Sequence, residues 1–125
     1  MKKILIVDDQ PIIRKMIRLA LNDDRFELEE AANADAAYEI IKRSPPDGMI
    51  LDVMMPGLLN GYQLCERIKQ DPILSYIHVV IVSACGQESD QEFGLSLGAN
   101  SYFVKPFSLV ALATYMKISL LGSAL

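Results

Sequence analysis

Residues 4–9 read Ile-Leu-Ile-Val-Asp-Asp, which is four aliphatic residues followed directly by two acids. An uninterrupted apolar run this short is typical of a parallel strand buried on both faces. Residues 49–52 repeat the pattern as Met-Ile-Leu-Asp. In an open α/β sheet, the carboxyl ends of neighbouring strands border the crevice in which ligands bind. The two stretches therefore predict three carboxylates, those of Asp8, Asp9 and Asp52, at one edge of a parallel sheet.

Strand and helix patterns alternate along the rest of the chain. The predicted strands are residues 4–7, 26–30, 49–51, 79–82 and 102–104. The predicted helices begin at Pro11, after the N-caps Asn33, Asn60 and Ser108, and at Ser89-Asp90, with Gly98 ending the fourth. Five strand–helix units predict an α/β fold with a doubly wound parallel sheet and right-handed crossovers. The polar run at residues 26–30 is expected at the edge of that sheet.

The composition predicts one folded domain spanning residues 1–125. Of its 125 residues 51% are hydrophobic and 22% charged, which argues against disorder, and the net charge of −4 argues against a nucleic-acid surface. The last seventeen residues hold one charge, Lys117, but are shorter than the ~20 residues of a membrane span. Cys65 and Cys85 lack metal-ligand spacing, so we expect buried free thiols in a reducing cytoplasm.

Four of the five predicted strands end in a reactive side chain. Asp8 and Asp9 follow the first strand, Asp52 the third, Ser83 the fourth and Lys105 the fifth. Crowded carboxylates repel one another, and a bound Mg²⁺ ion, which prefers oxygen ligands, would relieve that repulsion. A metal and a lysine can neutralise a phosphoryl group, a hydroxyl can donate a hydrogen bond to it, and a carboxylate can attack it. The set therefore predicts a site that handles phosphoryl groups.

Several motifs occur in order at these strand ends. They are Ile4–Asp9, Leu51–Gly57, Val82–Ala84, Gly98–Tyr102 and Lys105–Phe107. Together they resemble the receiver domain of bacterial two-component response regulators, over essentially the whole chain. The resemblance implies a flavodoxin-like (βα)5 sheet with strand order 2-1-3-4-5. The chain departs from the family in having three residues, not two, between Gly57 and Gly61.

The resemblance also implies roles for the acidic residues. Asp52 would accept a phosphoryl group from a phosphohistidine, on a sensor histidine kinase or a phosphotransfer protein. Asp9 and Asp52 would bind Mg²⁺ directly and Asp8 through water, with the backbone carbonyl of Met54 as a further ligand. No organic cofactor is implied. The chain would be a signalling protein that catalyses only its own phosphorylation and dephosphorylation.

The remaining implied roles concern switching. Ser83 would hydrogen-bond the phosphoryl oxygen, Lys105 would pair with the phosphoryl group, and Tyr102 would turn inward as Ser83 moves. An aromatic residue in a strand also fits plain core packing, so the reading of Tyr102 stays open between the two. Phosphorylation would favour an active arrangement of the fourth helix, fifth strand and fifth helix.

The C-terminal third of the chain is nearly uncharged. From Phe93 onward the only charges are Lys105 and Lys117. We therefore expect the face made by the fourth helix, fifth strand and fifth helix to bind an output domain, a downstream protein or a second copy through apolar contacts. Direct binding to nucleic acid or membrane is not expected.

Other classes of protein fit the sequence less well. A haloacid-dehalogenase-type phosphatase needs a second Asp two residues after the nucleophile, where this chain has Met54. Neither G-x-G-x-x-G nor a P-loop is present, which argues against a nucleotide-binding domain. His78 is the only histidine, so no histidine metal cluster can form, and we expect it at the surface away from the site. A pseudo-receiver that binds partners without phosphorylation remains the alternative function.

Overall fold

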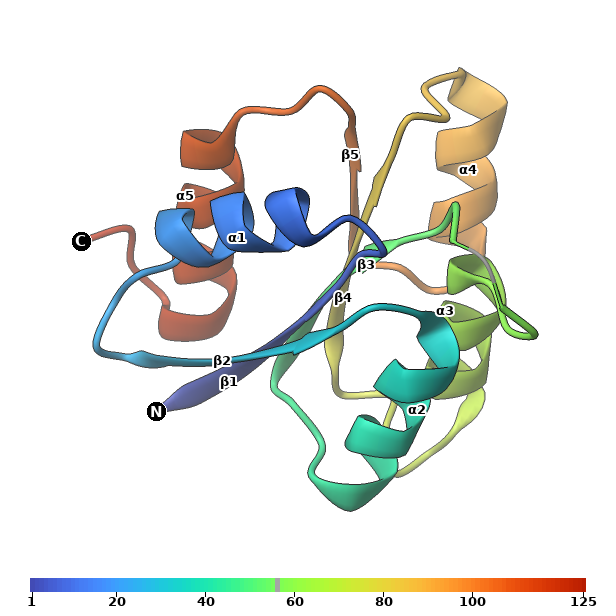
Figure 1. The fold of residues 1–125 in the computed structure, drawn as a ribbon, viewed down its shortest axis with the longest axis horizontal. Helices are drawn as coiled ribbons and strands as arrows, with labels where there is room; N and C mark the ends of the chain where they lie inside the picture. The colour runs from blue at the N-terminus through green and yellow to red at the C-terminus, as the bar shows by residue number, and fades with distance from the viewer. Residues whose placement is uncertain (56) are drawn as a thin grey trace.

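The structure, a computed structural model, describes residues 1–55 and 57–125, so Pro56 of the Leu51–Gly57 motif lies outside the described residues. Strands and helices alternate along the chain (Figure 1). The strands are β1 (Lys2–Val7), β2 (Phe26–Ala31), β3 (Gly48–Asp52), β4 (His78–Ser83) and β5 (Ser101–Val104). The helices are α1 (Pro11–Ala20), α2 (Ala34–Arg43), α3 (Gly61–Gln70), α4 (Glu88–Ser96) and α5 (Leu109–Leu121). Across the described residues, none of the helices is long and apolar enough to cross a membrane.

The five strands form one parallel sheet in the order β2-β1-β3-β4-β5, which confirms the predicted α/β fold. The polar strand β2 lies at one edge, as expected. The register sets the site, because Val7 of β1 pairs with Leu51 of β3, and Ser83 of β4 pairs with Val104 of β5. Asp8, Asp52, Ser83 and Lys105 therefore end four adjacent strands at nearly the same level.

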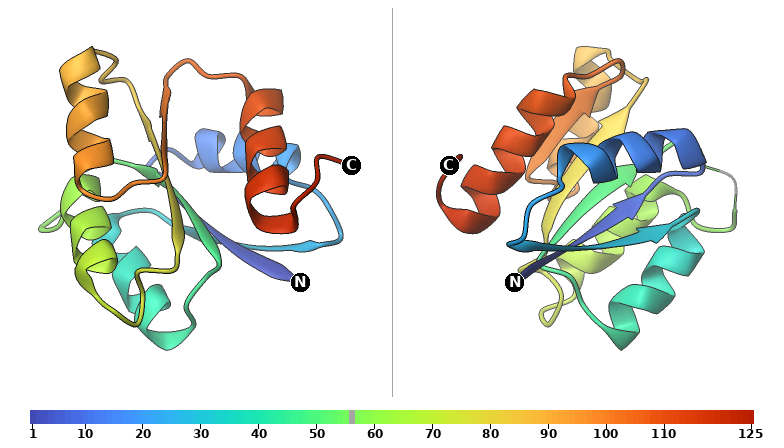
Figure 2. Two further views of the ribbon diagram at one scale, coloured as in Figure 1. Left: turned by 180° about the vertical axis from the view of Figure 1, so that it is seen from behind. Right: turned by 60° about the vertical axis from the view of Figure 1, so that its left-hand side comes forward.

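Helices cover both faces of the sheet. Figures 1 and 2 show α1 and α5 on one face and α2, α3 and α4 on the other. Alternate residues of each central strand therefore enter two separate cores: Leu5 and Leu51 pack on the α2–α3 side, and Ile6 and Ile50 on the α1–α5 side. The central strands are buried on both sides, which explains why their sequences are uninterrupted apolar runs.

The helix starts follow the predicted caps in three cases. The side chains of Asn33, Asn60 and Ser108 each accept a hydrogen bond from a backbone N–H three residues later. The predicted start of α4 at Ser89-Asp90 is wrong by one residue, because the helix begins at Glu88, after the N-cap Gln87. Asp90 instead lies inside the first turn, where its carboxylate accepts a hydrogen bond from the Gln87 N–H at 3.2 Å.

Two further predictions need correction. His78 is the first residue of β4 and is half-buried rather than at the surface, because its ring packs against Tyr115 of α5, with 2.7 Å between Nε2 and the tyrosine hydroxyl. Cys65 is a buried free thiol, as predicted, but Cys85 is only partly buried because it lies in the loop after β4.

Candidate functional site

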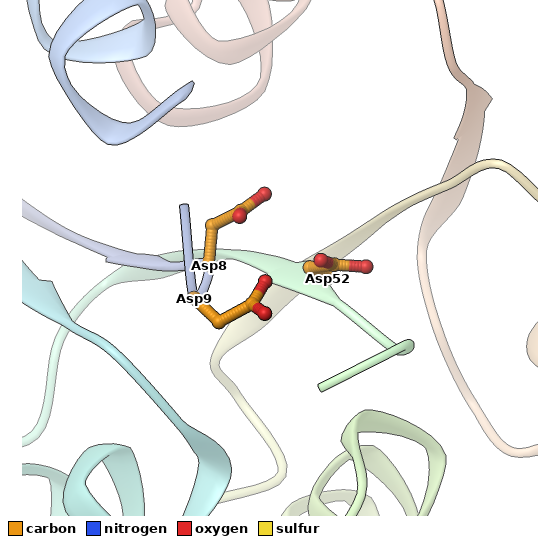
Figure 3. A group of neighbouring side chains, drawn as sticks. All are labelled: Asp8, Asp9 and Asp52. Carbon is orange, nitrogen blue, oxygen red and sulfur yellow. The ribbon is translucent and has the colours of Figure 1, made fainter. Parts of the chain in front are cut away.

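Three carboxylates meet at the carboxyl end of the sheet. Carboxylate oxygens of Asp8, Asp9 and Asp52 all lie within 4.8 Å of one another. Figure 3 shows the three side chains extending from the ends of β1 and β3 around one common space. Asp8 is 2% exposed and Asp52 5% exposed, whereas Asp9 is exposed at the rim. The structure thus brings together the acids that the two apolar runs predicted, two of them in a setting where their charge is costly.

Backbone and side-chain donors hold Asp8 in place. Its Oδ1 accepts a hydrogen bond from the Gln10 N–H at 2.9 Å. Its backbone carbonyl accepts one from Arg14 Nη1 at 2.7 Å, while Arg14 Nε lies 3.0 Å from a Glu30 carboxylate oxygen. Sequence reasoning missed Arg14, although a basic residue in the second turn of the helix that follows the acid pair was a usable signal. Arg14 ties α1 and β2 to the loop that carries Asp8 and Asp9.

Asp52 lies in a less favourable setting for a charged group. Its Oδ1 accepts a hydrogen bond from the Met54 N–H at 3.1 Å. Burial raises the pKa of Asp52, and the neighbouring charge of Asp8 raises it further, although the Met54 N–H and Lys105 oppose the rise. Among the described residues, three carboxylates face the one ammonium group that contacts them, so the site keeps an excess of negative charge.

Lys105 supplies that ammonium group. Its Nζ lies 3.0 Å from Asp8 Oδ2 and 3.4 Å from Asp52 Oδ2. Burial lowers the pKa of Lys105, but the hydrogen bond to Asp8 and the charges of both acids outweigh burial, so the net shift is upward. The lysine therefore stays protonated and bridges the ends of β1 and β3 from the end of β5.

Ser83 completes the row of strand ends. It is fully buried, and its Oγ accepts a hydrogen bond from the Cys85 N–H at 3.0 Å. Because that bond uses a lone pair of the oxygen, the hydroxyl proton of Ser83 is still available for donation. The Ser83 carbonyl accepts a hydrogen bond from the Lys105 N–H at 2.7 Å, which fixes the two residues relative to each other.

Among the described residues, the Tyr102 hydroxyl bonds to the loop after Ser83 and to Tyr62 rather than to a carboxylate. Tyr102 is half-buried, and its hydroxyl donates a hydrogen bond to the Cys85 carbonyl at 2.7 Å, in the loop that follows Ser83. The ring therefore faces inward and contacts the site through this loop. Tyr62 of α3 lies beside it, with 3.2 Å between the two hydroxyl oxygens. Sequence reasoning did not identify Tyr62, since no local pattern links positions so far apart in the chain.

The donor set suits a hard divalent cation. Asp8, Asp9 and Asp52 offer only oxygen atoms, which Mg²⁺ prefers, and the excess negative charge would be offset by such an ion. Met54 follows this group of acids, but its side chain is exposed and carries no oxygen atom that could bind such an ion. The structure leaves the role of the Met54 backbone carbonyl, which the resemblance implies, as a prediction.

Comparison with known proteins gives a consistent result. The family model described as response regulator receiver domain matches residues 4–117. The phosphate regulon transcriptional regulatory protein PhoB of Pseudomonas aeruginosa is 40% identical over 116 residues, which are 93% of this chain and 50% of PhoB. The chain therefore spans about half the length of that relative.

Solved structures agree. The crystal structure of a putative response regulator from Chloroflexus aurantiacus is 34% identical with a TM-score of 0.85, and the match covers 93% of this chain and 94% of that one. The receiver domain of a DNA-binding response regulator from Colwellia psychrerythraea is 26% identical with a TM-score of 0.90, over 98% and 100% of the two chains. The chain belongs to the response regulator receiver domains of two-component signalling.

Proposed function

We propose that the chain is a phosphorylation-dependent switch in which Asp52 accepts a phosphoryl group from a phosphohistidine. The donor would be a sensor histidine kinase or a phosphotransfer protein. The observation that carries the proposal is the buried acidic group itself, in which Lys105 bridges Asp8 and Asp52 beside the Ser83 hydroxyl. Receivers are signalling modules, so no separate substrate is expected.

The hydrogen bonds of Asp52 suit a nucleophile. The Met54 N–H holds Oδ1, so the carboxylate is fixed in orientation. One carboxylate oxygen forms the new bond to phosphorus while the nitrogen–phosphorus bond of the donor breaks. The electron pair of the broken bond stays with the imidazole nitrogen of the donor histidine, which is the leaving group. Lys105 would then pair with the phosphoryl oxygens, and the Ser83 hydroxyl would donate its proton into a hydrogen bond with one of them.

The acidic residues would hold Mg²⁺ as the cofactor. Asp9 and Asp52 would bind it directly, Asp8 through water, and Met54 through its backbone carbonyl. When bound, the ion supplies positive charge that lowers the repulsion between Asp52 and the incoming phosphoryl group. Arg14 and the Gln10 N–H would keep the Asp8–Asp9 loop in position for this.

The response would travel along the loop after β4. A Ser83 hydroxyl drawn toward the phosphoryl group shifts the Cys85 peptide, since the Cys85 N–H is bonded to Ser83 Oγ. The Cys85 carbonyl is bonded to Tyr102, so the inward position of that ring would be coupled to the site. The phosphoryl charge would thereby bias the arrangement of α4, β5 and α5.

The outer surface supports apolar partner binding. Phe93 and Leu95 of α4 and Val110 and Ile118 of α5 are exposed. We propose that this face binds an output domain, a downstream protein or a second copy. The exposed apolar surface also continues onto α1, at residues that sequence analysis did not single out: Ile12, Met16 and Leu19. A cytoplasmic location and the absence of direct nucleic-acid or membrane contacts complete the proposal.

The proposal predicts that a single substitution, Asp52→Asn, abolishes phosphorylation of the chain. Incubation with acetyl phosphate and Mg²⁺ should add the mass of one phosphoryl group to the intact chain. Asp52→Asn should abolish this gain, because a neutral amide replaces the nucleophilic carboxylate. Asp24→Asn, at an exposed position away from the site, is the matched control and should gain mass normally. A folded wild-type chain that gains no mass would contradict the proposal and favour the pseudo-receiver.

A further inference from the structure

A chain of hydrogen bonds leads from the acidic site to the surface of α3. It begins at Ser83 Oγ, which accepts from the Cys85 N–H at 3.0 Å. The Cys85 carbonyl accepts from the Tyr102 hydroxyl at 2.7 Å, and the Tyr102 oxygen lies 3.2 Å from the Tyr62 hydroxyl. Four groups from β4, the following loop, β5 and α3 are thus connected in one series.

The direction of the last bond follows from the proton count. A carbonyl oxygen can only accept, so Tyr102 must use its single hydroxyl proton on Cys85. The Tyr102 oxygen is then an acceptor, and Tyr62 is the donor. A hydroxyl that accepts a hydrogen bond becomes a better donor, so the Tyr62 bond strengthens the bond between Tyr102 and Cys85.

Packing around the two tyrosines leaves little freedom. The Phe93 ring of α4 meets the Tyr62 ring edge-on, with 5.0 Å between centroids and 69° between planes. Gly94, one residue further, lets α4 approach the Tyr102 ring, because a Cβ there would lie 2.9 Å from Tyr102 Cδ2. Burial and the hydrogen bond with Tyr102 raise the pKa of Tyr62, so its hydroxyl keeps the donated proton.

We propose that Tyr62 is a positioning residue of the switch, which holds the Tyr102 ring inward and thereby fixes the Cys85 carbonyl beside Ser83. This rests on the proposed function only where it assigns switching to Ser83 and Tyr102. The inward position of Tyr102 is then favoured before any phosphoryl transfer, by a donor on α3. Through this donor, α3 also takes part in the response to phosphorylation, although it lies outside the face made by α4, β5 and α5.

Tyr62→Phe tests the proposal with the least disturbance, because it keeps the ring that Phe93 contacts and removes only the donor. The readout is the side-chain rotamer population of Tyr102 in the full, unphosphorylated chain, from three-bond NMR couplings. We expect the inward-to-outward ratio to fall about fivefold, as the loss of one neutral hydrogen bond implies. Tyr76→Phe removes a hydroxyl at an exposed position and should leave the ratio unchanged. An unchanged ratio in Tyr62→Phe would overturn the proposal.

A double-substitution cycle separates positioning from general packing. The readout is the chemical shift of the Cys85 carbonyl carbon. Tyr62→Phe should shift this signal in the wild-type background and leave it unchanged in the Tyr102→Phe background, since Tyr62 acts only through Tyr102. Equal shifts in both backgrounds would overturn the proposal. Neither readout requires phosphorylation, so a chain that fails to gain a phosphoryl group contradicts the proposed function but not the positioning role.

Discussion

The two ends of the same sheet solve the problem of buried polar groups in opposite ways. At the carboxyl end, Asp8 and Asp52 are buried next to each other and share the single ammonium of Lys105. At the amino end, His78 Nε2 lies 2.7 Å from the Tyr115 hydroxyl, and burial lowers the pKa of His78 so that its ring favours the neutral form. Nearby, Lys69 Nζ lies 3.1 Å from the Ser75 carbonyl and also contacts the carbonyl of Ile77.

The two ends differ in how completely the chain itself balances the buried charge. At the amino end, each donor named above has its acceptor within the chain, so these contacts add stability. At the carboxyl end, the acids outnumber the cation, and burial keeps the pKa of Asp52 raised. Incompletely balanced charge in a buried site costs stability and is retained where a bound ion or a reacting group completes it.

Removing Lys105 should produce the largest change in stability. Lys105→Ala leaves Asp8 and Asp52 facing each other without a cation. We expect the free energy of unfolding to fall by about 2 kcal/mol, less than for a fully buried pair because the Lys105 side chain is 20% exposed. Lys15→Ala on the exposed face of α1 is the control and should change it little. Urea unfolding measures both. Mg²⁺ should stabilise Lys105→Ala more than the wild type, and equal stabilisation would contradict the account of unbalanced charge.

At the amino end, removing one hydroxyl should have a smaller effect. Tyr115→Phe leaves the ring packed against Phe103 and takes away the partner of His78, which should cost about 1 kcal/mol in the free energy of unfolding. Because the contact is far from the acids, the loss should be the same with and without Mg²⁺. If Mg²⁺ restored the stability that Tyr115→Phe loses, the two ends of the sheet would be coupled, which would contradict their separate roles.

The pH dependence of His78 should be the smallest effect. Burial lowers the pKa of His78 below its usual 6.5, and the charge of Lys69 lowers it further. The folded state therefore favours the neutral ring, and the unfolded chain binds the proton first as pH falls. His78 thus destabilises the fold as pH drops below about 6.5, and its effect levels off below the lowered folded pKa. In urea unfolding, His78→Gln should lose less stability than the wild type between about pH 7.5 and pH 5.5. If the wild type and His78→Gln lost the same stability over this pH range, groups other than His78 would be responsible for the pH dependence.

The sequence was sufficient for the sheet and for most of the acidic site. Short apolar runs that end in acid indicate parallel strands whose carboxyl ends meet at one edge of a sheet. That β1 lies beside β3 was implied by the resemblance, and the register of the two strands confirms it. The row of Ser83 and Lys105 follows from the same rule, because each lies at or just after the end of its strand.

The contacts that the sequence did not predict are those between distant side chains. The pairing of Tyr62 with Tyr102 depends on how closely α3 approaches the sheet, where a Cβ on Gly61 would lie 2.6 Å from Val53 Cα. Gly94 has the same effect on α4, which packs against the Tyr102 ring. The burial of His78 depends on where a residue of α5 lies over β4. Periodicity locates helices and strands, but it carries no information on which rings meet between them.

The central claim is that phosphoryl transfer acts at the carboxyl end of the sheet and is passed along the loop after β4. Backbone amide NMR spectra, recorded with Mg²⁺ before and after addition of acetyl phosphate, test it directly. The account predicts large shifts at Ser83, Cys85 and Tyr102 and none at His78 or Tyr115. Shifts of similar size at both ends, or no shifts in a chain shown by mass to be phosphorylated, would contradict it.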